Sequence, residues 1–187
     1  MIAALPMYDL PEIAWATDAL WAALRDRLHA TVRLVATPVY DAPGCDGPTY
    51  RSVVIVREDE ASATLGELRG KRAAFNSGDS LSGFVGLRAA LREADFDPAS
   101  FFSSWVETGG HRASCAAVAS GEADVAAIDC VTWGLLGKHA PREVEALRAL
   151  GWTPPAPSLP YVTTASRSDA EVAALRDALA GALADPA

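Results

Sequence analysis

The pattern of hydrophobic and polar positions predicts short strands that alternate with helices along most of the chain. Brief apolar runs rich in β-branched residues are typical of buried strands, and apolar residues three or four positions apart are typical of helices. Strands are expected at residues 2–5, 32–39, 52–56, 72–76, 104–107, 123–128 and 161–164. Helices are expected at residues 9–28, 64–70, 83–92, 111–120, 130–139, 141–147 and 168–183. This alternation predicts an α/β fold with a largely parallel sheet that is covered on both faces.

Composition excludes several classes of protein. Half of the 187 residues are hydrophobic and 21% are charged, a balance that excludes general disorder. No apolar run reaches the roughly 18–20 residues that span a bilayer, so direct membrane insertion is not expected. The formal net charge of -8 argues against a nucleic-acid partner, because phosphate binding needs clustered Lys and Arg.

Cysteines and histidines add little evidence for a metal centre. Cys45, Cys115 and Cys130 form no closely spaced pair, so a zinc cluster is not expected, although one disulfide remains open. The three histidines lack the spacing of metal ligands. We therefore expect neither a metal nor a cofactor.

The N-terminus carries no recognisable export signal. Residues 1–6 contain no Lys or Arg ahead of their apolar stretch, and that stretch is too short for the core of a signal peptide. This pattern is typical of a cytoplasmic chain or of one whose export sequence has been removed.

Residues 76–83 provide the strongest candidate for a ligand-binding turn, because they lie between a predicted strand and a predicted helix. Ser80 and Ser82 would present hydroxyl groups, and the N–H groups of Leu81, Ser82 and Gly83 would lie at the helix start. Such a start favours an anion, since exposed donors and the positive end of the helix dipole coincide. The alternative is an ordinary serine N-cap without a ligand.

Three further polar residues follow predicted strands. His111 comes after a glycine-rich turn and could donate to an oxyanion, or could simply be a solvated histidine at a helix start. Asp129 could accept from a ligand hydroxyl or pair with an ammonium group, or could cap the next helix. Tyr8 is a weaker candidate, because the neighbouring Asp9 already fits a capping role.

A catalytic site is a weaker interpretation. Cys130 beside Asp129, together with His111, could form a thiol nucleophile with a base. However, Cys130 follows a buried strand, and buried free cysteines are usually unreactive packing residues. We therefore expect no catalytic residue and no enzymatic activity.

Four short stretches together resemble one family. They are SGDSLSG at 77–83, GHRAS at 110–114, GEADVAAID at 121–129 and WTPPAPSLP at 152–160. Their order and separation resemble the phosphate/phosphite/phosphonate substrate-binding proteins of ABC transporters, a group joined with the alkanesulfonate binders and transferrins. The resemblance runs through nearly the whole chain, and it rests on the four stretches in order rather than on any one of them.

The resemblance implies a fold and a set of ligand contacts. The fold is an α/β, type II periplasmic-binding-protein-like architecture with two lobes joined by two crossing strands, near 53–57 and 159–164. One lobe would be residues 1–56 plus 159–187, and the other residues 57–158. By similarity, Ser80 and Ser82 with the adjoining N–H groups hold the anion and His111 donates to it. Asp129 faces the ligand, and Tyr8 approaches from the opposite lobe.

The function implied is capture of a small phosphonate-, phosphate- or phosphite-like oxyanion for an ABC permease in the membrane. The family resemblance implies a periplasmic location. The chain is shorter than such proteins, and the shortfall lies near residues 29–31, where the family has a further strand and a loop that lines the cleft. An enzyme or a ligand sensor on the same bilobal scaffold remains an alternative, because a fold does not fix a function.

Overall fold

The computed structural model describes residues 32–184, and the chain divides into two compact units. The larger unit is residues 40–156, and the smaller unit combines residues 1–39 with 157–187. The strand expected at 2–5, the helix expected at 9–28, Tyr8 and the shortfall near 29–31 lie outside the described residues.

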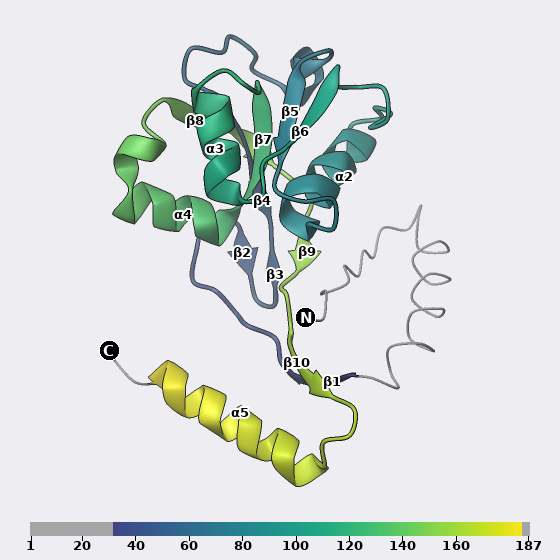
Figure 1. The fold of residues 1–187 in the computed structure, drawn as a ribbon, viewed down its shortest axis with the longest axis vertical. Helices are drawn as coiled ribbons and strands as arrows, with labels where there is room; N and C mark the ends of the chain where they lie inside the picture. The colour runs from purple at the N-terminus through teal and green to yellow at the C-terminus, as the bar shows by residue number, and fades with distance from the viewer. Residues whose placement is uncertain (1–31, 185–187) are drawn as a thin grey trace. The chain divides into compact units, whose positions relative to one another are not determined.

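A five-stranded sheet forms the centre of the larger unit (Figure 1). Its spatial order is β6-β5-β7-β4-β8. The strands are β4 (Ser52–Arg57), β5 (Arg72–Phe75), β6 (Ser104–Glu107), β7 (Val125–Asp129) and β8 (Leu147–Trp152). β5 is parallel to β6 and to β7, but β4 is antiparallel to both of its neighbours. The sheet is therefore mixed rather than largely parallel, because a buried apolar run such as β4 does not encode its own direction.

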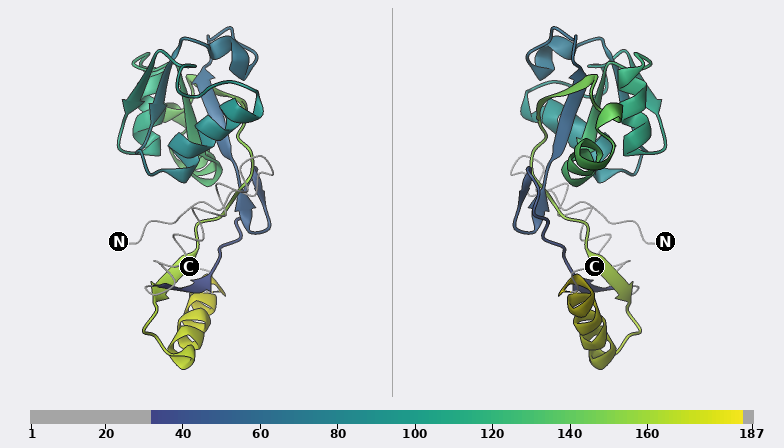
Figure 2. Two further views of the ribbon diagram at one scale, coloured as in Figure 1. Left: turned by 90° about the vertical axis from the view of Figure 1, so that its right-hand side faces the viewer. Right: turned by 90° about the vertical axis from the view of Figure 1, so that its left-hand side faces the viewer.

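Helical segments connect these strands. They are η1 (Leu65–Leu68), η2 (Leu81–Val85, a π-helix), α2 (Gly86–Glu93), α3 (His111–Ala119), α4 (Cys130–His139) and η3 (Pro141–Glu143). α2 joins β5 to β6 on one side, and α3 joins β6 to β7 back across β5. Two crossovers of the same hand that run in opposite directions place their helices on opposite faces of the sheet. Figure 2 gives two side views of this arrangement.

β4 is buried on both faces, which confirms the expectation of a sheet covered on both sides. Val54 and Val56 belong to a core cluster that includes Leu87 and Leu91 of α2. Val53 and Ile55 alternate with them and are fully buried as well, so their side chains project to the other face. α3, whose buried residues include Cys115 and Val118, contacts β4 and β7.

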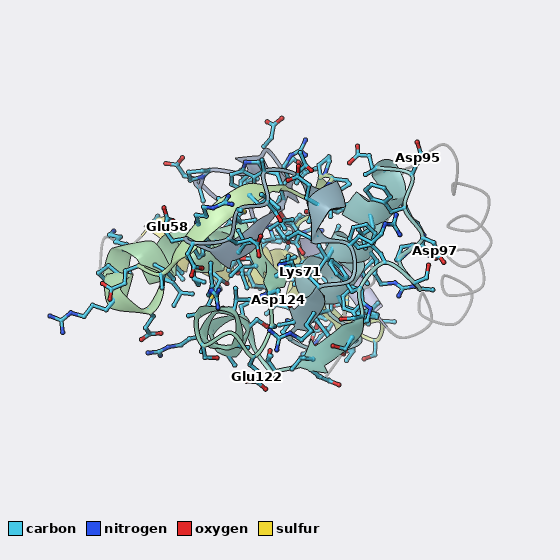
Figure 3. All side chains as sticks on the ribbon, turned by 90° about the horizontal axis from the view of Figure 1, so that it is seen from above. Glu58, Lys71, Asp95, Asp97, Glu122 and Asp124 are labelled. Carbon is cyan, nitrogen blue, oxygen red and sulfur yellow. The ribbon has the colours of Figure 1, made fainter. Side chains whose placement is uncertain are left out.

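The amino ends of the parallel strands are tied together at the edge seen from above in Figure 3. The Arg72 guanidinium donates to both oxygens of Asp124, and the backbone N–H of Arg72 donates to the same carboxylate at 2.8 Å. Lys71 forms an ion pair with Glu60 at 3.0 Å. The Arg72–Asp124 pair therefore connects the neighbouring strands β5 and β7, and the Lys71–Glu60 pair connects the segment before β5 to the segment after β4.

The smaller unit contains a two-stranded antiparallel ribbon and one long helix. The ribbon pairs β1 (Val32–Ala36) with β10 (Tyr161–Thr164), and the helix is α5 (Asp169–Ala184). The Arg176 side chain of α5 donates to the Val35 carbonyl at 2.7 Å. Val172 of α5 is buried, but Leu175 and Leu183 are exposed.

A separate small sheet has the order β2-β3-β9, with β2 (Cys45–Asp46), β3 (Thr49–Tyr50) and β9 (Ala156–Pro157). β2 and β3 belong to the larger unit.

Two segments differ from the expected elements. The helix expected at 141–147 is only the short η3, and β8 follows it as an edge strand of the sheet. The helix expected at 83–92 begins earlier, with the π-helical turn at Leu81. Within residues 32–184, no helix is both long and apolar enough to cross a membrane.

The chain divides into its two compact units between Val39 and Tyr40 and between Ala156 and Pro157. β4 lies wholly within the five-stranded sheet of the larger unit, with hydrogen-bonded neighbours on both sides. The lobe boundaries expected after residues 56 and 158 stay a prediction.

Candidate anion-binding site

Three of the predicted ligand residues lie at one edge of the five-stranded sheet. The Ser80 turn follows β5, His111 follows β6 and Asp129 ends β7. Because these three strands are parallel neighbours, their carboxyl ends meet at the same edge. The sheet therefore brings together residues that are far apart in the sequence.

Ser80 caps the helix that begins at Leu81. Its Oγ accepts a hydrogen bond from the Gly83 N–H at 3.0 Å, so this amide has a partner within the chain. The N–H groups of Leu81 and Ser82 stand at the first two helical positions, where no intrahelical acceptor exists. The Leu81 side chain is buried, so this residue can offer a ligand only its backbone. No acidic side chain stands in the first turn.

Gly83 is required by a close approach of Asn76. A Cβ atom at position 83 would lie 2.0 Å from Asn76 Oδ1, which is too short for any contact. Asn76 Oδ1 is itself buried and has no hydrogen-bond partner within the described residues. A glycine at 83 thus lets the end of β5 and the helix start pack directly against each other.

His111 contacts the same helix start through Ser82. Ser82 Oγ lies 2.8 Å from His111 Nε2, a hydrogen bond whose direction depends on the tautomer of the ring. His111 Nδ1 is buried, without a partner in residues 32–184. Burial lowers the pKa of His111, and the Asp129 carboxylate partly opposes this shift. The imidazole is therefore neutral near pH 7 and can act as a hydrogen-bond donor or acceptor.

The turn before His111 is fixed by hydrogen bonds to the end of β5. The N–H of Gly109 donates to the Asn76 carbonyl at 2.9 Å, and Gly109 has a positive φ of 83° that favours glycine. Thr108 Oγ1 donates to the Phe75 carbonyl at 3.0 Å and lies 2.7 Å from Ser114 Oγ. These bonds position His111 relative to the Ser80 turn.

Asp129 caps α4 and carries the negative charge of the site. Its Oδ1 accepts from the Thr132 N–H at 2.8 Å, so the capping interpretation of this residue is correct. A carboxylate has further lone pairs, and its charge acts on both His111 and Tyr50.

Tyr50 belongs to this cluster and was not predicted. Its ring is 4% exposed, and its pKa is raised by burial and by the Asp129 carboxylate, while a hydrogen bond with Ser82 opposes that rise. Tyr50 lies just before β4, in which Ser52 pairs with Asp129. Because β4 is antiparallel to β7, its amino end reaches the edge formed by the carboxyl ends of β5, β6 and β7. The signal in the sequence is an aromatic residue just before a buried strand. If β4 were parallel to β7, this residue would lie at the opposite end of the sheet, so the expectation of parallel strands excludes it from the site.

The cluster combines several hydrogen-bond donors with one carboxylate. An oxyanion could accept hydrogen bonds from the serine and tyrosine hydroxyls, the imidazole and the first-turn N–H groups. The Asp129 carboxylate could accept a hydrogen bond from a protonated ligand oxygen or pair with a cationic group. In the part of the chain that the structure describes, no three His, Cys, Asp or Glu side chains are grouped so as to hold a metal ion.

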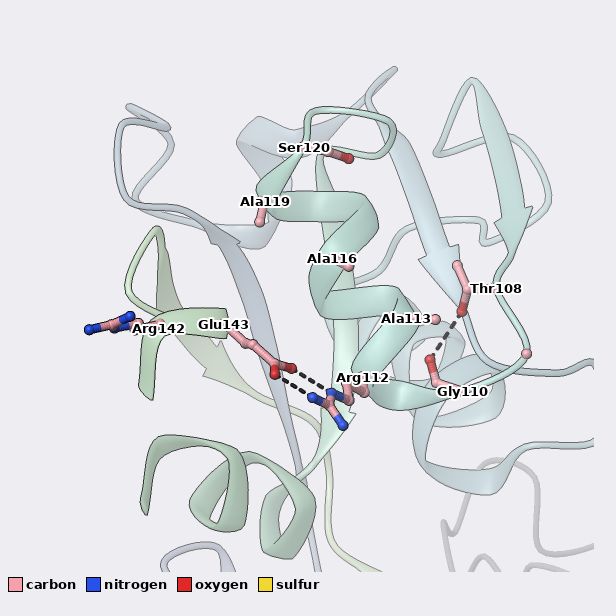
Figure 4. Close-up of a pocket in the computed structure, with 10 residues that line it drawn as sticks. Thr108, Gly110, Arg112, Ala113, Ala116, Ala119, Ser120, Arg142 and Glu143 are labelled. Carbon is pink, nitrogen blue, oxygen red and sulfur yellow. Dashed lines mark hydrogen bonds and ion pairs between the residues drawn. The ribbon is translucent and has the colours of Figure 1, made fainter. Parts of the chain in front are cut away.

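A separate hollow of about 830 Å³ runs along the outer face of α3 (Figure 4). Alanines 113, 116 and 119 line it, and an ion pair between Arg112 and Glu143 crosses one end. It borders the turn before His111, but its lining includes none of the serines of the Ser80 turn, nor Asp129. The hollow is therefore distinct from the polar cluster.

Comparison with solved structures finds similar folds in binding proteins. XAC2383 from Xanthomonas citri, bound to chloride, matches with a TM-score of 0.65 and 22% identity over 88% of this chain and 62% of its own. A binding protein component of an ABC phosphonate transporter from Pseudomonas aeruginosa matches with a TM-score of 0.62 and 23% identity, over 81% and 50% of the two chains. PhnD1 from Prochlorococcus marinus, in complex with methylphosphonate, matches with a TM-score of 0.64 and 22% identity, over 78% and 53%.

These neighbours establish the type II periplasmic-binding-protein fold, as predicted. This chain spans less than two thirds of the length of each of the three structures above. No curated protein sequence matches the chain.

Residues 8–186 match the family described as ABC transporter, phosphonate, periplasmic substrate-binding protein. The match covers nearly the whole chain and confirms the family resemblance based on the four sequence stretches. The protein thus belongs to the phosphonate substrate-binding family of ABC transporters.

Proposed function

We propose that this protein captures a small oxyanion of the phosphonate, phosphate or phosphite class and delivers it to an ABC permease. The observation that carries the proposal is the 2.8 Å contact between Ser82 and His111 at a helix start with no acidic residue in its first turn. Membership of the family supports the choice of ligand class. In this proposal Ser80, Ser82 and the N–H groups of Leu81 and Ser82 surround the anion.

Hydrogen-bond donors, rather than full positive charges, would hold the anion. His111 is neutral near pH 7, and Tyr50 stays protonated because its pKa is raised. The helix start adds a partial positive charge and directed N–H groups. Such a site binds through charge-assisted hydrogen bonds, which are stronger than those between neutral groups.

Asp129 would select among anions of this class. Its carboxylate repels a fully ionised phosphonate but accepts a hydrogen bond from a singly protonated one. It would also pair with an ammonium group on the organic tail of the ligand. We therefore expect the best ligands to carry a proton on the phosphonate or an amino group beside it.

Location and partner follow from the family. The proposed compartment is the periplasm, and the proposed partner is the membrane permease. A non-catalytic role is supported by Cys130, because burial raises the pKa of this thiol to about 12 and leaves little thiolate at pH 7. Tyr8, expected to contact the ligand from the other lobe, stays a prediction.

Calorimetric titration tests the ligand class. Protein stripped of bound ligand would be titrated with phosphate, phosphite, methylphosphonate, 2-aminoethylphosphonate and methanesulfonate. We expect at least one phosphorus oxyanion to bind and the Ser82→Ala variant to bind it more weakly by roughly 1–3 kcal/mol. Absence of heat with every ligand in correctly folded protein would contradict the proposal.

A second titration tests the selectivity of Asp129. The affinity ratio between 2-aminoethylphosphonate and ethylphosphonate would be measured in the parent and in Asp129→Asn. We expect the ratio to fall by about tenfold in the variant, because the amide keeps the shape but loses the charge. An unchanged ratio would show that the amino group, if bound, lies elsewhere.

A further inference from the structure

Two cysteines from distant parts of the sequence meet beside the anion-binding cluster. Cys45 lies in β2 and Cys130 is the first residue of α4, 85 positions further along the chain (Figure 1). Both are free thiols, and their Sγ atoms are 3.4 Å apart. A disulfide needs about 2.0 Å, so the sulfurs must approach by about 1.4 Å from the observed 3.4 Å. Closure of this gap requires rotation of the two side chains.

The backbone on both sides holds this pair together. Gly44 packs so closely that a Cβ atom there would lie 3.0 Å from Cys130 Cβ and 2.4 Å from Trp152 Cζ3. The Cys130 N–H donates to the Arg51 carbonyl at 3.2 Å, and the Cys45 N–H donates to the Ala42 carbonyl at 3.0 Å. The proximity of the thiols therefore follows from packed backbone segments.

The two thiols differ in access to solvent. Cys45 is partly exposed, whereas Cys130 is 2% exposed. A dissolved oxidant therefore reaches Cys45 first, and Cys130 is placed to complete the reaction from within. Cys115, the third cysteine, is 1% exposed and lies in α3, so it serves as an internal control.

The pair also connects two parts of the proposed site. Cys45 pairs with Tyr50 in the β2–β3 hairpin. Cys130 directly follows Asp129 in the chain. A bond between the sulfurs would join the hairpin that carries Tyr50 to the strand end that carries Asp129.

We propose that Cys45 and Cys130 form a disulfide on exposure to a low-molecular-weight disulfide oxidant, and that this bond strengthens anion binding by fixing Tyr50 beside Asp129. The first half of the proposal is independent of the ligand, and the second half rests on the proposed function. Reduced freedom of the hairpin lowers the entropy lost when a ligand binds, and this is the physical source of the gain.

The chemistry is thiol–disulfide exchange with a reagent R–S–S–R such as oxidised glutathione. The Cys45 thiolate attacks one sulfur of the reagent, forms Cys45–S–S–R and releases R–S⁻. The Cys130 thiol then loses its proton, and its sulfur attacks the Cys45 sulfur and releases the second R–S⁻. The two thiol protons end on the released thiolates, so the protein thiols are oxidised and the reagent is reduced to two R–SH.

The first experiment identifies the bond. The full chain would be treated with oxidised glutathione, its free thiols counted under denaturing conditions, and its disulfide mapped by mass spectrometry of peptides. We expect the count to fall from three thiols to one in the parent and from two to none in Cys115→Ser, with a peptide linking Cys45 to Cys130 in both. In Cys45→Ser we expect no intramolecular disulfide. A stable glutathione adduct on Cys45 with Cys130 still reduced would overturn the proposal.

The second experiment measures the effects of the bond. Oxidation should raise the melting temperature of the parent by about 5–10 °C, because the bond closes a long loop, and a reductant should reverse the rise. Oxidation should also lower the Kd for methylphosphonate several-fold in the parent, but should leave both quantities unchanged in Cys45→Ser.

The outcomes separate the two proposals. If the disulfide forms but the Kd for methylphosphonate is the same in both redox states, the effect on the site is refuted. If neither redox state binds any phosphorus oxyanion, the proposed function fails, while the disulfide itself stands on the peptide map.

Discussion

Within residues 32–184, two helices follow a serine N-cap, and they differ in how the polar groups of their first turns are satisfied. At the start of α5, Ser168 is joined by Glu171, whose Oε2 accepts from the N–H and the hydroxyl of Ser168. At the start that follows Ser80, the first turn has no acidic residue, and the neighbours are Ser82, His111 and Tyr50. The first turn of α5 thus contains a carboxylate that accepts hydrogen bonds from its cap, whereas the first turn of η2 contains none.

The difference separates a structural cap from a candidate ligand site. Thr64 and Glu67 form a second complete capping box, with the Glu67 carboxylate accepting from the Thr64 N–H at 3.2 Å. A helix start whose donors already have a carboxylate has little to offer an external anion. The Ser80 start, lacking one, gains more from an external ligand.

The largest expected effect comes from Gly83→Ala. The new Cβ would lie 2.0 Å from Asn76 Oδ1, so the buried Asn76 side chain or the helix start must shift. Because a shift of the helix start moves several donors together, we expect anion affinity to fall by about 2–4 kcal/mol, roughly 30- to 1000-fold, in a calorimetric titration.

Gly78→Ala is the matched control for this change. No atom lies within 4 Å of a Cβ at position 78, so the substitution should leave affinity unchanged. Equal affinities for the two alanine variants would mean that the geometry at Gly83 is irrelevant to the ligand.

The next effect compares Ser80→Ala with Ser168→Ala. Each variant loses an N-cap hydroxyl and should lose about 1 kcal/mol of unfolding free energy, measured by urea denaturation. Only Ser80→Ala should also weaken anion binding, by roughly 1–3 kcal/mol. If both variants bind the anion as the parent does, the Ser80 turn is no more than a cap.

The smallest effect is a difference in acid response. Burial lowers the pKa of His111 below its unfolded value near 6.5, so the unfolded chain takes up a proton that the folded chain refuses. The stability contributed by neutral His111 is therefore present above that value and is lost as pH falls below it. The melting temperature of anion-free protein should be lower at pH 5.5 than at pH 7.5, and this decrease should be smaller in His111→Gln than in the parent.

Glu171 provides the contrast within the same titration. Hydrogen bonds from the Ser168 N–H and from Arg167 lower its pKa to about 2. Its contribution is lost only as pH falls from the usual glutamate range toward 2, so Glu171→Gln should leave the change between pH 7.5 and 5.5 as in the parent. If the loss of thermal stability between pH 7.5 and 5.5 is smaller in Glu171→Gln than in the parent, Glu171 rather than His111 is the source of the pH dependence.

Sequence patterns predicted most elements of the larger unit, because its strands and helices carry strong apolar periodicity. β4, β5, β6 and α3 lie close to their expected positions. β8 was missed because it is an edge strand with only Leu147 buried and a glycine at 151, so its apolar signal is weak. The direction of β4 was missed because pairing partners are set by the whole sheet rather than by local sequence.

The candidate site was predicted in part for the same reason. Residues that follow parallel strands, such as Ser82, His111 and Asp129, could be grouped by the rule for strand ends. Tyr50 could not, because it reaches the edge only through an antiparallel strand. The pair Cys45 and Cys130 also depends on that hairpin, and no spacing rule connects two thiols so far apart in the chain.

The wide first turn of η2 has a consequence for donor supply. The Ser80 carbonyl accepts from the N–H of Val85 at 3.0 Å, five residues ahead, where an α-helix would use the N–H of Phe84. One additional amide is thereby released from the ladder at the mouth of the helix. In a regular α-helical turn the Phe84 N–H would donate to the Ser80 carbonyl. The π-turn therefore leaves the helix N-terminus with one more N–H group outside the helical hydrogen-bond pattern.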